Sequence, residues 1–590
     1  MRSVFPTSLL AVASFAAAWA ICFIASDAFD APWLALRWAD VVAGGALTLA
    51  LSQIAAQRRG HAIATGHIWV FLSAAVFAIA VCLKYASGVS SDVMLFGLFP
   101  ASDANGYLIG AVSYLENGRL SEWATRRPFA ALHLAGLLAL TGHDLRVSLV
   151  LLAALCAAGT LLVVAALRAR FGPAAAFGAF VSLFPFIYLT LNTTMSESLG
   201  FALGCVAFAL LVEAADGGKR RWVWIGLALL SVGLMARAGA LFVLPALILW
   251  CGWRWRGVDS RFSWTTAAVA ALAVVGAYAI NKFFIIVYGA PGQAAFGNFS
   301  FTLYGLAIGG ESWTRFFVDF PNAAGLPEGE QAAAAYHAAL THMRAAPFDL
   351  IQGIAKRYND FLINTGWHKY VPNVILRGFV LLLALTGLIH CWRRRREPVP
   401  SLLLAGFAGI LLSVPFLGDG GPRVFAATHG FSAAFVALGI VAIQLRVASA
   451  QDDPRPTGLR FAAVIFAVLV LLPLAVATIH APNHELAPAR DCPIGETHFA
   501  GRIVGSRALC SADAVDCPGL RGESLRATNI WQMPIVNEMA GIASPTVIGL
   551  AVSPTDWIWL RAHQLPRSGA KIEVCRPAQT SGGGPFDYRP

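Results

Sequence analysis

Long apolar stretches, separated by short polar connectors, constrain this fold more than any other feature of the sequence. A helix needs about 20 mostly apolar residues to cross the roughly 30 Å of hydrocarbon in a bilayer. The chain has 590 residues, of which 57% are hydrophobic and only 13% are charged, so it cannot cover several water-facing domains and is not disordered. We therefore predict an all-α polytopic membrane protein. About thirteen stretches qualify as spans: 8–25, 41–57, 67–87, 146–167, 173–191, 198–215, 222–236, 239–252, 264–287, 374–392, 400–417, 424–446 and 461–480.

Two regions are weaker candidates for spans. The halves of 222–252 are short and are separated by Arg237. The apolar stretch 129–142 is too short to cross a bilayer comfortably, which favours an interfacial or re-entrant helix.

Basic residues follow every even-numbered stretch, and this pattern predicts the orientation. Lys and Arg concentrate in cytoplasmic loops, so the N-terminus is expected in the cytoplasm and the C-terminus on the external side of the membrane. The formal charge of +11 then reflects topology, and no nucleic-acid partner is expected. The first stretch, 8–25, could instead be a cleaved signal peptide, because the basic residue Arg2 precedes it. The basic groups are Arg58 and Arg59; Arg168 and Arg170; Lys219, Arg220 and Arg221; Arg254 and Arg256; Arg393–Arg396; and Arg446, Arg455 and Arg460.

The long polar segments all fall on the external side of this topology. We predict a transmembrane domain over 1–480, with external loops at 88–145 and 288–373, followed by a periplasmic domain at 481–590. The tail contains three short runs typical of strands, so a small α/β domain is expected. Those runs are Thr546–Val552, Trp557–Leu560 and Lys571–Val574.

The tail also holds an even number of cysteines in an oxidising compartment. This predicts one or two disulfides, with three pairings open. Because the tail has no CxxC pair, no metal site is assigned there. The cysteines are Cys492, Cys510, Cys517 and Cys575.

Two carboxylates at the external mouth of the predicted bundle are candidates for chemistry. Asp103 follows the third stretch, and partial burial there would make its carboxylate a stronger base, although a helix N-cap is the alternative. Glu197 begins the sixth stretch, where it could instead favour the positive end of that helix. Both lie at the same face of the membrane, so they can share one site.

Arginines at the same face are candidates for binding a phosphate. Arg423 precedes the twelfth stretch, with His429 about two turns further on, and Arg237 interrupts an apolar region. A guanidinium binds phosphate well, while interfacial snorkelling is the alternative. In the second external loop, Lys356 and Arg357 lie among aromatic residues that suit a sugar-phosphate site or an interfacial belt.

In combination, these motifs resemble the GT-C superfamily of glycosyltransferases that use polyprenyl-phosphate sugars. The superfamily includes the aminoarabinose transferases and the protein O-mannosyltransferases. The resemblance covers roughly residues 67–450 and rests on the order of the motifs rather than on any single one. The matching positions are Asp103-Ala104-Asn105-Gly106-Tyr107, Ala111, Gly118, Arg127-Pro128, Met195-Ser196-Glu197, Arg237 through Pro245, and Arg423.

The resemblance implies roles for the matching residues. Asp103 would act as the base on an acceptor hydroxyl, with Glu197 as a second catalytic carboxylate. Arg423 would hold the donor phosphate, supported by Arg237, Arg127 and Tyr107. Inversion at the anomeric carbon would follow.

The resemblance also leaves the cofactor open. Many members carry a paired acid where this chain has Ala104 and Asn105 beside the first acid, so no cofactor is assigned and a divalent cation stays open.

The residues and the resemblance together predict a glycosyltransferase of a bacterial inner membrane, which moves a sugar from a polyprenyl-phosphate donor to a lipid, glycan or protein acceptor on the periplasmic side. Alternatives are an enzyme of the O-antigen ligase or polymerase type, and a lipid or solute transporter. No P-loop and no internal repeat support the transporter. The sugar and the acceptor are not specified by the sequence.

Overall fold

The structure is a computed structural model. It describes residues 77, 80, 93–95, 99–100, 102–142, 145–217, 220–257, 260–291, 297–371, 374–417 and 420–444, together with strands between 496 and 588. The predicted spans at 8–25, 41–57 and 461–480, and nearly all of 67–87, lie outside the described residues.

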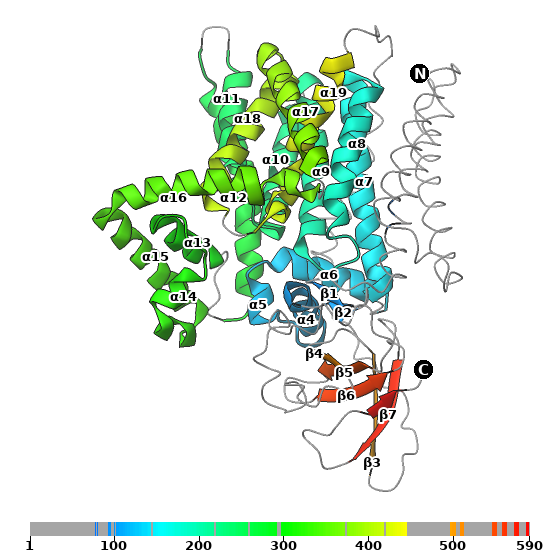
Figure 1. Ribbon diagram of the computed structural model, residues 1–590. Helices are drawn as coiled ribbons and strands as arrows, with labels where there is room; N and C mark the ends of the chain where they lie inside the picture. Colours follow the sequence, from blue (N-terminus) through cyan, green and yellow to red (C-terminus); the bar gives the residue numbers. More distant parts are fainter. Residues whose placement is uncertain are drawn as a thin grey trace, which may run out of the picture.

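Long helices that run along a common direction form the body of the molecule (Figure 1). They correspond to the predicted stretches from 146 to 446, and the short pair at 222–252 forms two separate helices. Five described segments are long and apolar enough to cross a membrane: Val147–Phe171, Ser196–Asp216, Trp264–Tyr288, Pro398–Phe416 and Pro422–Ile443. The helices are α7 (Leu145–Phe171), α8 (Pro173–Tyr188), α9 (Ser196–Gly217), α10 (Arg220–Ala236), α11 (Val243–Arg254), α12 (Trp264–Tyr288), α17 (Val374–Arg393), α18 (Pro398–Ser413), η5 (Val414–Phe416), η6 (Pro422–Thr428) and α19 (His429–Gln444).

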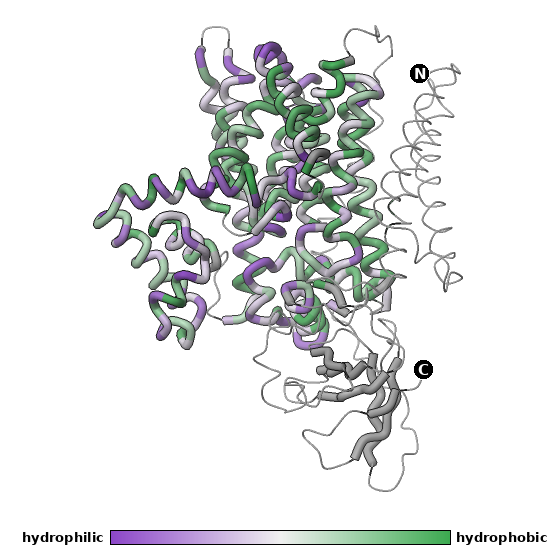
Figure 2. The backbone as a smooth tube through the Cα atoms, viewed as in Figure 1, coloured by the Kyte–Doolittle hydropathy of each residue, from purple (hydrophilic) through white to green (hydrophobic). Residues whose placement is uncertain are grey.

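Helix α9 lies in the centre of the bundle and is almost wholly buried, whereas α12 exposes most of its surface. Apolar colours run along most of the body of the bundle in Figure 2. A helix that is apolar on all sides and buried belongs to the core of a large protein or to a membrane bundle. Helix α9 is therefore the central helix of the bundle, packed against α7, α10, α18, α19 and η6.

The two ends of α9 carry different chemistry. At its C-terminal end, Glu213 and Asp216 pair with Arg170 at distances of 3.0 and 3.5 Å. Arg394, from the connection between α17 and α18, lines the same cleft as Arg170. Two of the predicted basic groups thus meet at one end of the bundle, and Glu197 lies at the opposite end of the same helix.

Three short helices from the first predicted external loop cover that opposite end (Figure 1). They are α4 (Ser102–Asn117), α5 (Glu122–Thr125) and α6 (Pro128–Leu140), preceded by a hairpin of β1 (Met94–Leu95) and β2 (Phe99–Pro100). Helix α6 has 13 residues and is buried over most of its length. It would extend only about 20 Å, which is too short to span a bilayer, as the sequence predicted.

The second predicted external loop folds as a helical unit beside the bundle (Figure 1). Phe301, Tyr304, Phe316 and Ala335 form its own small apolar core. A salt bridge of 2.6 Å between Arg126 and Glu328 joins the unit to the first loop. Its elements are α13 (Asn298–Ala307), α14 (Arg315–Asp319), η2 (Pro321–Gly325), α15 (Glu328–Ala345), α16 (Pro347–Asp360), η3 (Phe361–Thr365) and η4 (Trp367–Tyr370).

The tail contains strands, including all three that the sequence predicts. β3 pairs antiparallel with β7, and a second sheet has the order β4-β5-β6-β8, in which β6 and β8 are parallel. The side chains of the four tail cysteines lie outside the described part, so their pairing stays a prediction. The strands are β3 (Glu496–Arg502), β4 (Ala508–Ser511), β5 (Thr546–Ala551), β6 (Trp557–Ala562), β7 (Lys571–Pro577) and β8 (Phe586–Tyr588).

Candidate functional site

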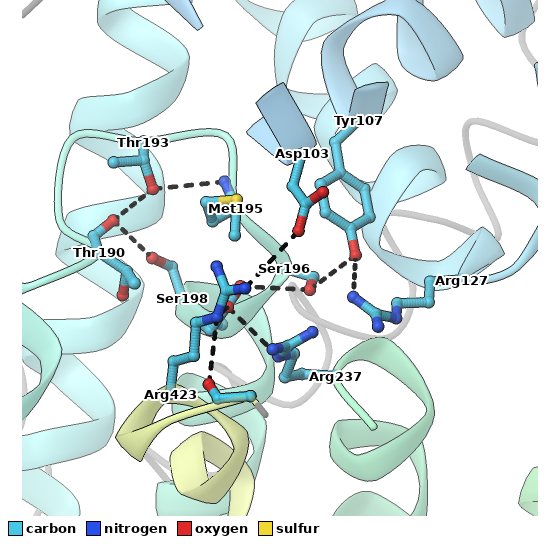
Figure 3. Close-up of polar contacts among 12 residues, drawn as sticks. Asp103, Tyr107, Arg127, Thr190, Thr193, Met195, Ser196, Ser198, Arg237 and Arg423 are labelled. Atoms are coloured by element: carbon cyan, nitrogen blue, oxygen red, sulfur yellow. Dashed lines mark hydrogen bonds and ion pairs between the residues drawn. The ribbon is translucent and has the colours of Figure 1, made fainter. Parts of the chain in front are cut away.

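Five charged residues from distant parts of the chain converge at the end of the bundle that α4 covers (Figure 3). Asp103 comes from the first turn of α4, Arg127 from the start of α6, Glu197 from the first turn of α9, Arg237 from the turn after α10, and Arg423 from η6. We call these residues the charged cluster. It contains three guanidinium groups and two carboxylates, so it carries an excess of positive charge.

Glu197 lies at the centre of the charged cluster and is only 1% exposed. Its Oε1 lies 3.3 Å from Arg237 Nε and 3.8 Å from Arg423 Nε. Because Glu197 is in the first turn of α9, its carboxylate also lies at the positive end of the helix dipole. Burial would make an isolated carboxylate very costly, so the two arginines are what allow Glu197 to be charged here.

A chain of hydrogen bonds connects Arg127 to Glu197. Arg127 Nη1 donates to the Tyr107 hydroxyl at 2.7 Å, and this hydroxyl donates to Ser196 Oγ at 2.9 Å. Ser196 Oγ in turn donates to Glu197 Oε2 at 3.4 Å. The Tyr107 ring is buried and packs edge-on against Trp123, with 4.7 Å between ring centroids. Arg127 and Tyr107 therefore support the cluster from the side of α4.

The loop before α9 fastens α4 to the cluster, and sequence reasoning missed this role. Thr194 Oγ1 donates to the carbonyl of Ala104 at 2.6 Å, directly beside Asp103. Thr193 Oγ1 donates to the Thr190 carbonyl at 2.7 Å and so closes the loop on itself. Asn192 has a φ of 61°, a left-handed conformation that Asn tolerates better than most residues. In the sequence, the pair of threonines that follows Asn192 is the feature that could have indicated this connection to α4.

Asp103 and Arg423 form the more open edge of the cluster. Their side chains are 37% and 34% exposed, and Asp103 Oδ2 lies 3.9 Å from Arg423 Nη2. That separation is longer than a hydrogen bond, so the two groups attract each other without consuming their hydrogen-bonding capacity. Arg423 Nε donates to the Gly420 carbonyl at 3.3 Å, which orients the guanidinium.

Two glycines allow η6 to approach the bundle closely enough to bring Arg423 to this edge. A Cβ on Gly204 of α9 would overlap the carbonyl of Ala427, and a Cβ on Gly239 would overlap the carbonyl of Val424. Both glycines therefore stand where any side chain would push η6 outward.

The second external loop reaches the segment of Arg423 but does not join the charged cluster. Arg357 is buried and donates to the carbonyl of Glu311, while Lys356 pairs with the Glu311 carboxylate at 2.9 Å. Arg357 also lines a narrow cleft together with Gly421 and Val424. The volume of this cleft, about 10 Å³, is close to what one water molecule needs.

His429 lies in an apolar core instead of beside Arg423, contrary to the phosphate-binding role that the sequence suggested. Its ring stacks on Phe186 at 3.9 Å and also contacts Trp367 and Tyr370. Its Nε2 hydrogen-bonds to the Ser182 carbonyl at 3.2 Å. Aromatic side chains cover the ring, so it has no room for a ligand.

A metal centre has no donor set within the described residues, where no group of three or more His, Cys, Asp and Glu side chains comes together. Arg423 lies within 4 Å of both Asp103 and Glu197, and a guanidinium there opposes a second cation. No metal or cofactor is assigned to the site.

Comparisons with known proteins give distant likenesses. No family model matches the chain, and no curated protein matches it. Among solved structures, the chain is similar to the oligosaccharyltransferase of Archaeoglobus fulgidus crystallised with zinc and sulfate, with 13% identity and a TM-score of 0.37, covering 69% of this chain and 54% of that one. This chain thus spans about half the length of the archaeal protein.

The chain is also similar to ArnT from Cupriavidus metallidurans. The apo structure has 16% identity and a TM-score of 0.28, and the structure bound to undecaprenyl phosphate has 15% identity and a TM-score of 0.29. Each covers 64% of this chain and 78% of that one. At TM-scores this low, none of the three structures assigns a residue or an activity to this chain.

Proposed function

We propose that the chain is a membrane glycosyltransferase that moves a sugar from a polyprenyl-phosphate donor to a lipid, glycan or protein acceptor, on the periplasmic face of a bacterial inner membrane. The observation that carries the proposal is the 3.9 Å pair of Asp103 and Arg423 at the open edge of a buried, net positive cluster. The sequence resemblance to the GT-C superfamily supports the same class of reaction.

The excess positive charge suits a phosphate leaving group. As the bond between the sugar and the donor phosphate breaks, negative charge develops on the phosphate oxygens, and fixed cations stabilise that charge. Arg423 is about one-third exposed and would contact the phosphate, for which its planar donor array is well matched. Arg237 and Arg127 are held in place behind it by Glu197 and Tyr107, so their charge is preorganised.

Asp103 would be the general base. Its carboxylate is 37% exposed, so an acceptor hydroxyl can reach it, and it lies beside the guanidinium that would hold the donor. The acceptor oxygen would lose its proton to Asp103 and form the new glycosidic bond, while the anomeric carbon releases polyprenyl phosphate from its opposite face with inversion. Glu197, being buried, would hold the arginines rather than touch the acceptor.

The test of the base compares Asp103→Asn with wild type in the full chain, purified into lipid nanodiscs. Sugar transfer from a panel of polyprenyl-phosphate sugars is measured together with binding of undecaprenyl phosphate. Losing a general base should lower turnover by about 10²- to 10⁴-fold while lipid-phosphate binding is kept. Glu122→Gln removes an exposed carboxylate from neighbouring α5 and serves as the matched control. Equal turnover in Asp103→Asn and wild type would exclude Asp103 as the base.

The test of phosphate binding compares Arg423→Gln with Arg315→Gln, which removes a guanidinium that pairs with Asp319 on α14. A lost hydrogen bond to a charged group costs about 1.5–3 kcal/mol, so undecaprenyl phosphate should bind roughly 10- to 150-fold more weakly to Arg423→Gln only. Equal binding by the two variants would contradict the proposed site. Substrate flux in proteoliposomes without any covalent product would instead favour a transporter.

A further inference from the structure

We propose that α16 and η3 lie in the membrane interface, at the end of the bundle that carries the charged cluster, with one apolar side embedded among the lipids. We call the exposed residues Phe348, Ile351, Ala355 and Leu362 the apolar stripe. This inference concerns the surface of the second external loop and does not depend on the chemistry of the charged cluster.

Helix α16 has three different sides. One is buried against the rest of the protein and includes Gly353, Arg357 and Phe361. A second is exposed and polar, with Gln352 and Lys356.

The third side is the apolar stripe, in which Phe348, Ile351 and Leu362 are 80%, 61% and 62% exposed. Phe348, Ile351, Ala355 and Leu362 follow one another at intervals of three, four and seven residues, so they form a continuous strip along one edge of the exposed surface. Gln352 and Lys356 lie along the other edge. Leaving such apolar side chains in water forfeits the favourable free energy of burying apolar surface.

The depth of α16 follows from its contact with α18. The Tyr358 hydroxyl donates to the carbonyl of Leu411 at 3.1 Å. Leu411 lies inside the apolar segment Pro398–Phe416, five residues before its end, which corresponds to about 8 Å along the helix axis. Amphipathic interfacial helices bury their apolar side about 5–10 Å into the boundary between headgroups and acyl chains. The depth of about 8 Å at which Tyr358 contacts α18 falls within this range for interfacial helices.

The direction of α16 and its surroundings also fit a lipid partner. Figure 1 shows α16 extending sideways from the bundle, across the direction of the long helices. Beside its contact, Leu412 of α18 is 58% exposed, and the chain continues from η4 into α17, where Val374 and Leu382 are 73% and 59% exposed. Leu412 lies on a segment long and apolar enough to cross the membrane, and Val374 and Leu382 lie on a helix that the sequence predicts to span it. These side chains would therefore face lipid, beside the apolar stripe.

The placement has a consequence for the site. Arg357, on the buried side of α16, lines the cleft that contains Gly421 and Val424 of the Arg423 segment. An α16 at interfacial depth therefore holds η6 at the level of lipid headgroups, where the phosphate of any membrane lipid lies.

The experiment places single spin-labelled cysteines along α16 of the full chain in liposomes of phosphatidylethanolamine and phosphatidylglycerol. Ile351→Cys and Ala355→Cys report on the apolar stripe, while Gln352→Cys and Lys356→Cys report on the polar side. Collision with oxygen, which concentrates in lipid, and with a water-soluble nickel chelate is measured for each label. The unmodified chain gives the background from the native cysteines, and elution as a single species checks folding of each variant.

We expect labels on the apolar stripe to collide several-fold more with oxygen than with the nickel chelate, and labels on the polar side to show the reverse order. Equal access of the chelate to both sides would overturn the proposal, because α16 would then lie in water. Protection of the apolar stripe from both reagents would also overturn it, since protein, such as a second copy of the chain, would then cover the stripe. Ala355→Cys keeps the test decisive if Ile351→Cys fails to fold.

Discussion

Glu197 Oε1 lies 3.3 Å from Arg237 Nε, and the two side chains are only 1% and 5% exposed. Each charge would be costly in this buried position without the other, and Arg423 Nε lies 3.8 Å from the same carboxylate oxygen. The pair therefore links the packing of α9 against the turn after α10 to the electrostatics of the site. Removing either partner should affect both.

Glu197→Gln should destabilise the protein by about 3–5 kcal/mol, because it leaves the buried Arg237 without a counter-charge. The free energy of unfolding in mixed micelles is the measurement. Adding Arg237→Met to Glu197→Gln should recover part of the stability, since the unpaired charge is then gone, but should not recover lipid-phosphate binding. A Glu197→Gln variant as stable as Glu122→Gln would show that the pair is not essential to the fold.

Tyr107→Phe should cost about 1–3 kcal/mol, because it deprives Arg127 Nη1 and Ser196 Oγ of the hydroxyl they share while keeping the ring against Trp123. Unfolding in the same micelles measures the loss. Tyr336→Phe, on the partly exposed surface of α15, is the matched control and should be close to neutral. If both substitutions cost the same, the hydrogen-bond chain contributes little.

Gly239→Ala should displace η6, because the added Cβ would overlap the carbonyl of Val424. We expect a loss of about 1–3 kcal/mol in stability and weaker binding of undecaprenyl phosphate, since Arg423 follows η6. Gly276→Ala is the control: its Cβ meets nothing within 4 Å on α12, and alanine favours a helix by up to about 1 kcal/mol. Unchanged binding in Gly239→Ala would mean that η6 does not need this close approach.

Acid should loosen the segment around η4 through His368. Burial lowers the pKa of His368 below its ordinary 6.5, and nearby Arg377 and Lys369 lower it further, while the hydrogen bond to the Leu362 carbonyl opposes them. The unfolded segment therefore binds a proton more readily than the folded one. Stability is fully present above pH 6.5 and falls as the pH drops from 6.5 toward the lower folded pKa.

Hydrogen exchange of residues 361–371 at pH 7.5 and pH 5, corrected for intrinsic rates, measures this effect. The segment should exchange faster at pH 5 in wild type, and His368→Gln should abolish the difference. His337→Gln, on exposed α15, should keep it. A difference that persists in His368→Gln would assign the titration to another group.

Much of the helical body could be predicted because apolar stretches long enough to span a bilayer have few other structures open to them. The ranges at 146–167 and 264–287 coincide closely with α7 and α12. The second external loop was harder to predict. Its helices pack on one another through a small core of their own, and the aromatic residues there did not reveal helical packing before the contacts were known.

The candidate site was predictable in its members but not in its geometry. Asp103, Glu197 and Arg423 stand out because ionisable groups near a membrane are costly, and the structure places Arg423 within 4 Å of each of the two carboxylates. Spacing along the chain could not show that Glu197 is buried while Asp103 is open, because that depends on how α4 and η6 close over α9. It also could not exclude His429, whose aromatic neighbours come from α8 and η4.

The salt bridge between Arg126 and Glu328 connects the helical unit of the second external loop to the charged cluster. Arg126 is the neighbour in sequence of Arg127, whose Nη1 donates a hydrogen bond to the Tyr107 hydroxyl. A displacement of the first turn of α15 would therefore reach the Tyr107 hydroxyl through the backbone that joins these two neighbouring arginines.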